Sequence, residues 1–275
     1  MKPILIIPIE LYPQFNISNY RFVIEVGNVD QIQKAIEIVK EHDQCLSIFC
    51  ELNKVDVVSL LNMDIQPSMN VYINCTFNGD IISVIKALKP LEKPERTPSI
   101  TYLFPTDTPN LVTLLKVLSS CGYKSGIKLD YNSVISKEDF IELATYSYLS
   151  PVPHAHIEPF GFIQQEIRDK IKYVDVNKFY YNAPDTFAHV AQDGGVYIKC
   201  EFSELQKRLC DSVEDLSKIN YSNISMEYKK LRFYNHFDAE DDCCKCANFK
   251  ICLGFYKNRF EDCQETMSSI YEMLF

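Results

Sequence analysis

The distribution of apolar residues along the chain predicts a parallel sheet covered by helices. Short runs rich in β-branched residues alternate with segments in which apolar residues recur every three or four positions. The predicted strands are Pro3–Ile9, Arg21–Val26, Cys45–Glu51, Asn70–Thr76, Ser99–Phe104, Gly126–Tyr131 and Val152–Glu158. Strands that alternate with helices in this way build βαβ units, so the pattern indicates an α/β fold.

Three predicted helices each carry one apolar face that would pack on the sheet. Their apolar positions are Ile32, Ile36 and Val39, then Ile81, Val84, Ile85 and Leu88, then Leu111, Leu114, Leu115 and Leu118. Ser136, followed by Asp139, is a predicted helix cap, and Asp107 or Thr108 stands before Pro109 at another predicted helix start. The strand-helix unit recurs often enough for a complete or partial β/α barrel, and an open doubly wound sheet is the alternative.

The alternation of strands and helices ends after residue 160. The segment Tyr173–Cys200 reads as short strands and turns, with Asp193, Gly194 and Gly195 as a hairpin turn, and Glu204–Leu216 reads as a helix. We therefore predict two domains. Residues 1–172 form a partial β/α barrel, and residues 173–275 form a small cysteine-rich domain.

Composition narrows the range of partners. The 275 residues carry a formal net charge of −9, and no run of lysine and arginine interleaves with aromatic residues, so nucleic acid is not an expected partner. The N-terminal apolar run Ile4–Ile7 lies between Pro3 and Pro8 and is too short for a membrane span or a signal peptide. We expect a cytoplasmic protein that does not insert into membranes, with reduced thiols.

Five of the eleven cysteines lie between residues 243 and 263. Cys243, Cys246 and Cys252 follow the spacing C-x2-C-x5-C, and Cys263 supplies a fourth sulfur. Four thiolates this close along the chain can bind one tetrahedral zinc ion or one four-iron cluster. Buried or disulfide-bonded cysteines are the alternative.

The turn Gly195-x4-Cys200, followed by this cysteine run, resembles the SPASM domain of radical S-adenosylmethionine peptide maturases. Members of that family pair a partial β/α barrel with a C-terminal domain that holds one or two auxiliary four-iron clusters. The resemblance implies one [4Fe-4S] cluster bound by the four tail cysteines at 243, 246, 252 and 263. For a second cluster only Cys200 matches, and Tyr256 stands where the family has another cysteine.

The resemblance fails at the N-terminal end. A radical enzyme of the family carries C-x3-C-x2-C after its first barrel strand, and the loops Glu10–Tyr20 and Gly27–Asp30 contain no cysteine. The resemblance therefore implies a degenerate member without radical activity of its own, and S-adenosylmethionine is not expected. Such a protein would be an accessory in peptide maturation. Its partners would be a precursor peptide, a radical maturase or an ATP-grasp ligase.

A second candidate site is His154, His156 and Glu158. Strand alternation would place these side chains on one face, near the end where β/α barrels assemble their sites. They could hold zinc or iron for hydrolysis or oxygen chemistry, with a structural zinc in the tail. A hydrogen-bonded barrel lining without metal is the simpler interpretation, and a structural zinc-bound interaction module is a third hypothesis. No catalytic residue is assigned from the sequence.

Overall fold

The structure is a computed structural model that describes residues 2–15, 17–40, 42–63, 65, 67–88, 99–129, 133–169, 173–199, 206–227, 242–257, 259–260 and 262–274. Its strands are β1 (Ile4–Pro8), β2 (Phe22–Val26), β3 (Cys45–Asp56), β4 (Asn70–Thr76), β5 (Ile100–Pro105), β6 (Lys124–Lys128), β7 (Ile157–Glu158), β8 (Phe187–Val190), β9 (Val196–Lys199) and β10 (Gln206–Cys210). Within the described residues they form one ten-stranded sheet in the order β10-β9-β8-β1-β2-β3-β4-β5-β6-β7. The predicted α/β class is confirmed.

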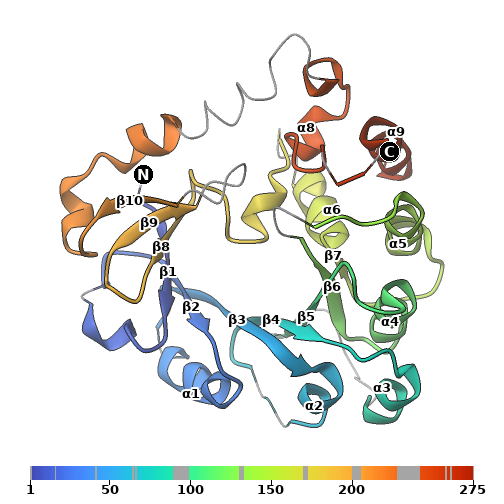
Figure 1. Cartoon of the computed structure of the whole chain (residues 1–275), viewed down its shortest axis with the longest axis horizontal. Helices are drawn as coiled ribbons and strands as arrows, with labels where there is room; N and C mark the ends of the chain where they lie inside the picture. The colour runs from blue at the N-terminus through green and yellow to red at the C-terminus, as the bar shows by residue number, and fades with distance from the viewer. Residues whose placement is uncertain are drawn as a thin grey trace.

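The helices that follow the parallel strands are α1 (Asp30–Val39), α2 (Val57–Leu61), α3 (Ile81–Ala87), α4 (Leu111–Ser120), α5 (Lys137–Leu149) and α6 (Phe160–Arg168). Connections between parallel strands are right-handed, so strands that keep their chain order receive their helices on the same face. Figure 1 shows α1 to α5 along the outer side of a curved sheet. In the part of the chain that is described, no helix is long and apolar enough to cross a membrane.

The sheet is open, with β7 and β10 as its edge strands in the described chain. Closure into a barrel is therefore not seen. Strand β8 lies parallel to β1. Strand β9 runs antiparallel to both of its neighbours, β8 and β10. The predicted hairpin turn joins β8 to β9: Gly194 has a φ of 81°, which favours glycine, and the Gly195 amide donates to the Asp193 carboxylate over 2.9 Å. Strands from residues 173–275 thus extend the sheet formed by residues 1–172.

An aromatic segment, Phe179 to Tyr181, covers part of the inner side of the sheet. The Tyr181 and Ser47 hydroxyls are 2.6 Å apart, and the rings of Phe179 and Tyr72 lie 5.5 Å apart. The Tyr180 hydroxyl donates to the carbonyl oxygen of Ile127 over 2.7 Å. These contacts give the inner side an apolar cover that helices α1 to α5, on the outer side, cannot provide.

The C-terminal tail docks beside β7. Its helices are α8 (Phe249–Cys252) and α9 (Cys263–Leu274), and Figure 1 shows α9 next to α5. The Phe140 ring of α5 lies 5.2 Å from the Tyr256 ring and 4.7 Å from the Phe260 ring. Lys137 and Glu265 form a salt bridge of 2.6 Å between α5 and α9. Aromatic packing therefore holds the tail in place, because a partly exposed ion pair contributes little.

Several predicted element boundaries are wrong. The last parallel strand is Ile157–Glu158 instead of Val152–Glu158, because prolines at 151 and 153 interrupt regular strand pairing. Strand β6 begins two residues before the predicted Gly126. The predicted helix over Glu204–Leu216 is instead β10 and the 3-10 turn η3 (Asp215–Lys218).

One of the two predicted helix starts is confirmed, and the other is wrong. The Ser136 hydroxyl accepts the Asp139 amide over 3.0 Å, which confirms that cap. The start of α4 differs from the prediction: its N-cap is Asn110, in the left-handed region with a φ of 54°, and Pro109 precedes it. Helices α2 and α6 were not predicted. Helix α2 has only five residues, too few turns for a periodic pattern to stand out, and α6 follows the proline-rich segment directly, with Pro159 as its N-cap.

The close contact between β6 and β7 yields a stability prediction. A Cβ atom on Gly126 would lie 2.7 Å from the Glu158 Cβ and 2.8 Å from its carbonyl oxygen, whereas one on Gly27 would meet nothing within 4 Å. Gly126→Ala should therefore lower the free energy of unfolding by about 1–3 kcal/mol, and the control Gly27→Ala should change it by less than about 1 kcal/mol. Urea unfolding measures both. Equal stability of the two variants would contradict the β6–β7 packing.

Candidate functional site

The tail cysteines lie at the ends of short local elements. Cys243 is in the 3-10 turn η4 (Asp242–Lys245), and the Cys246 amide donates to the Cys243 carbonyl oxygen over 3.2 Å. Cys252 is the last residue of α8, and Cys263 is the first residue of α9.

Three of the four tail thiols affect one another electrostatically, and the fourth, Cys252, acts with Cys263 on Tyr256. The pKa of the Cys263 thiol is raised to about 12, chiefly by burial and further by the charges of Cys243 and Cys246. The pKa of Tyr256 is raised by burial and by Cys252, and Cys263 adds to it. Among the described residues, however, no three His, Cys, Asp or Glu side chains lie at metal-binding separations. The thiols are neighbours that have not converged on one point.

Tyr256 lies near the thiols of Cys252 and Cys263, both of which add to the effect of burial in raising the pKa of its hydroxyl. Its side chain is fully buried, and its hydroxyl has no hydrogen-bond partner in the described part of the chain. A buried donor without an acceptor is costly, and thiolate or sulfide sulfur could accept from it. By donor type, the four tail thiols match the ligands of an iron–sulfur cluster or a zinc ion.

Other cysteines contribute little to this region. Cys200, the predicted additional ligand, lies outside the described residues, so its position is not established. Burial raises the pKa of Cys45, Cys50 and Cys75, which sit in β3 and β4. The nine cysteines whose side chains the structure describes are all free thiols.

His154, His156 and Glu158 are not brought together as metal ligands. Only Glu158 belongs to β7, so the predicted strand alternation over these residues is wrong. His154 Nδ1 lies 2.8 Å from the Val152 carbonyl oxygen, and its ring lies 4.8 Å from the ring of Tyr146 on α5. His156 is exposed. The group of metal-binding side chains that this hypothesis requires is absent from the described structure.

A polar row on the inner side of the sheet was not predicted. Strand register places five residues side by side, and we call them the inner row: Glu51, Asn74, Leu103, Gly126 and Glu158. The row lies near the carboxyl ends of β3 to β7, where β/α proteins commonly build their sites. Lys128 of β6 and Glu51 of β3 form a salt bridge of 3.0 Å across the intervening β4 and β5. The inner side is therefore polar at this end.

Glu158 has an unusual protonation equilibrium. Burial raises the pKa of its carboxyl to about 7, although the amide of Phe162, which donates to it over 2.8 Å, and the charge of Lys124 both lower it. The charge of Glu158 in turn adds to the raised pKa of Tyr72, whose main cause is burial. A carboxyl that titrates near neutral pH can exchange a proton with a bound molecule.

The inner row and the tail meet at Tyr180. Its ring stacks on that of Phe255, with centroids 5.9 Å apart. Burial raises the pKa of the Tyr180 hydroxyl, and both Tyr256 and Glu158 add to the effect. Tyr180 therefore lies near Tyr256 of the tail and near Glu158 of the inner row.

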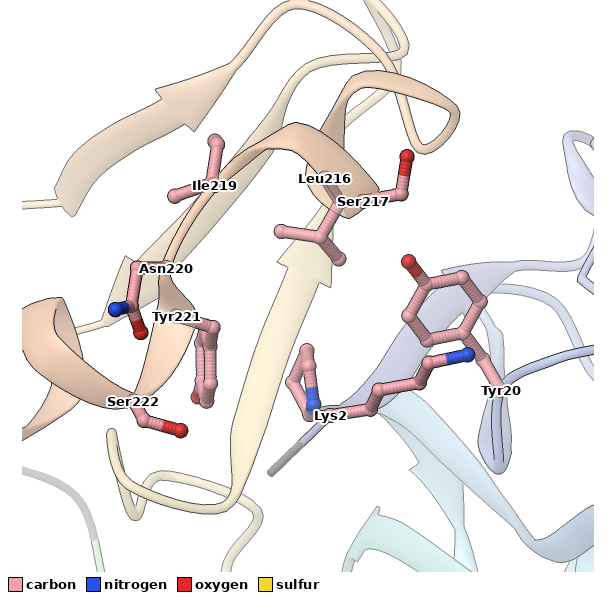
Figure 2. Close-up of a pocket in the computed structure, with 9 residues that line it drawn as sticks. Lys2, Tyr20, Leu216, Ser217, Ile219, Asn220, Tyr221 and Ser222 are labelled. Atoms are coloured by element: carbon pink, nitrogen blue, oxygen red, sulfur yellow. The ribbon is translucent and has the colours of Figure 1, made fainter.

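A surface hollow lies at the opposite, amino-terminal ends of β1 and β2. Figure 2 shows Lys2 and Tyr20 on one side of it and the segment Leu216–Ser222 on the other. The Lys2 ammonium contacts the Asn19 carbonyl oxygen at 3.4 Å and lies 5.2 Å from the centre of the Tyr20 ring. The Tyr221 hydroxyl donates to the Pro184 carbonyl oxygen over 2.7 Å. Because these groups contact the protein itself, the hollow is a weaker candidate than the inner row.

Comparison with known proteins gives no relative. No family model, curated protein or solved structure matches the chain. The candidate sites therefore rest on the chemistry of the residues themselves. The tail thiols around Tyr256 and the inner row beside Tyr180 are the two arrangements that the described structure offers.

The raised pKa of Glu158 predicts a pH-dependent stability. A carboxyl with a pKa of about 7 in the folded protein and 4.5 as its ordinary value binds its proton more strongly when folded. Its contribution to stability is present below pH 4.5 and is lost as the pH rises through 7. Relative to the wild type, Glu158→Gln should gain on the order of 2 kcal/mol between pH 4.5 and pH 8, less if residual solvent contact screens the charge.

Chemical unfolding at several pH values measures this difference. Glu272→Gln, at an exposed position of α9, is the control and should follow the wild-type pH profile. Parallel pH profiles of stability for wild type and Glu158→Gln would show that the pKa of the Glu158 carboxyl is not raised in the folded protein.

Proposed function

We propose that the chain binds one [4Fe-4S] cluster through Cys243, Cys246, Cys252 and Cys263. On this proposal it is an accessory protein of the SPASM type, without radical activity of its own, in the maturation of a ribosomally made peptide. The observation that supports the proposal is the C-x2-C-x5-C spacing of Cys243, Cys246 and Cys252, together with the buried, unsatisfied hydroxyl of Tyr256 near Cys252 and Cys263. Soft sulfur donors at C-x2-C spacing are the ligands such clusters use.

The sheet supports the same proposal. A partial β/α barrel has parallel strands in chain order with helices on the outer side, and β1 to β7 with α1 to α5 have this arrangement. Residues 1–172 would be the barrel-like part and residues 173–275 the cluster-binding part. The loop after β1 carries no cysteine, so a radical-generating cluster lacks its ligands there.

The bound cluster would supply a covalent link between segments of the tail. The ligands are spread over separate elements: Cys243 lies in η4, Cys252 ends α8 and Cys263 begins α9. Metal binding would draw these thiols together, and its free energy would then stabilise the tail. The tail packs on Phe140 of α5, so the ordered cluster region would present a fixed surface next to that helix.

Metal analysis of protein purified without oxygen tests the proposal. The wild type should be brown and contain about four iron atoms and four sulfides per chain. Cys252→Ser and Cys263→Ser should each lose most of this iron, because a serine hydroxyl is a poor substitute for a thiolate. Cys121→Ser, at an exposed position after α4, is the matched control and should retain the wild-type content.

Two results would reject the cluster. Colourless protein with one zinc ion per chain would show that the tail is a zinc site instead. Protein with neither iron nor zinc would show that the thiols are not ligands.

A further inference from the structure

The strongest unassigned feature is the side chain of Asn74 in the inner row. Asn74 is only 1% exposed, and neither its amide nitrogen nor its carbonyl oxygen has a hydrogen-bond partner among the described residues. Its neighbour two residues earlier, Tyr72, contacts the aromatic cover on the inner side, so Asn74 faces that side as well. A carboxamide offers one donor and one acceptor side by side. Its complement is a group with a carbonyl oxygen and an N–H.

Two carboxylates on neighbouring strands share the inner side with Asn74. Glu51 is its register partner on β3, and Glu25 of β2, which is opposite Phe49, faces the same side one strand farther away. The pKa of Glu25 is raised first by burial, lowered by Lys199 and raised again by the carboxylates of Glu51 and Glu10. Glu25 forms no salt bridge with any residue in the described ranges. A cation next to Asn74 would relieve this repulsion.

Lys128 already places one ammonium group in this region. Its Nζ lies 3.0 Å from a Glu51 carboxylate oxygen, and the side chains of the pair are 21% and 31% exposed. A partly exposed ion pair of this kind is weak and open to competition. A ligand ammonium could therefore replace Lys128 beside Glu51, with the rest of the ligand against Asn74.

We propose that Glu51, Glu25 and Asn74 form a binding site for a primary ammonium group adjacent to a carbonyl, which is the chemistry of an amino acid or of a peptide N-terminus. The carboxylates bind the ammonium, and the Asn74 carboxamide binds the neighbouring carbonyl and N–H. Lys128 is an internal competitor for the same carboxylate. The site uses no tail cysteine, so it stands or falls independently of the proposed cluster.

Titration calorimetry with three small probes tests the ligand chemistry. The probes are alanyl-alanine amide, its N-acetylated form, and free alanine. We expect the first to bind and N-acetylation to weaken binding at least about tenfold, because it removes the positive charge. Free alanine binding as tightly as the dipeptide would assign the site to amino acids, and weaker binding of alanine would assign it to a peptide N-terminus. Equal binding of the acetylated form, or no binding of any probe at millimolar concentration, would overturn the proposal.

Three variants test whether these residues bind a ligand or only stabilise the fold. Asn74→Leu should abolish binding of the dipeptide amide while melting at or above the wild-type temperature, because leucine has similar volume and leaves no unsatisfied amide. Lys128→Met should tighten binding several-fold by removing the competitor. Lys116→Met is the control, since it removes the Lys116–Glu142 ion pair on the outer helices α4 and α5 and should leave binding unchanged.

Each variant also has a contradicting outcome. Lower thermal stability of Asn74→Leu would show that the carboxamide is a satisfied structural group. Weaker binding by Lys128→Met would show that Lys128 supports the ligand and does not compete with it. Either result would overturn the assignment.

Discussion

The chain order of the parallel strands is the constraint from which the rest of the structure follows. Seven parallel strands that keep their sequence order place their connecting helices on one side, so the inner side of the sheet needs a separate cover. The segment Phe179 to Tyr181 provides it, with the Tyr181 hydroxyl against Ser47 and the Phe179 ring against Tyr72. Strand β8 follows this segment directly and pairs with β1. The same stretch of chain therefore covers the inner side and extends the sheet.

The cover is apolar, but the carboxyl ends of the strands stay polar. Glu51, Asn74 and Glu158 share one row there, and the Glu51–Lys128 ion pair crosses it. Tyr180 forms the link between this row and the tail, because it stacks on Phe255 and is coupled to both Glu158 and Tyr256. The tail thiols and the polar row are thus adjacent regions of one buried network. A ligand at the row and a cluster at the tail would share Tyr180 as their common neighbour.

The sequence predicts the framework well and the sites unevenly. Periodicity locates β1 to β5, α1, α3 and α4, because the apolar residues of each recur with the period of its element. It fails at β7, where prolines leave a two-residue strand, and at Glu204–Leu216, whose strand pairs with a distant segment. The inner row could not be recognised, because register between strands is not visible in a single sequence. Glu51 and Asn74 lie within predicted strands. A polar residue near the end of each strand was the feature of the sequence that could have pointed to the inner row. The tail cysteines were identified by spacing alone, whereas the unsatisfied Tyr256 hydroxyl required the structure.

The account depends most on the four tail sulfurs sharing one inorganic centre. Mössbauer spectroscopy of protein prepared without oxygen from iron-labelled medium tests that claim most directly. If the four sulfurs bind one cluster, the protein-bound iron gives the spectrum of a cubane cluster with tetrahedral sulfur coordination. This spectrum then disappears in Cys263→Ser. A spectrum of isolated iron ions only, or no iron signal at all, would contradict it.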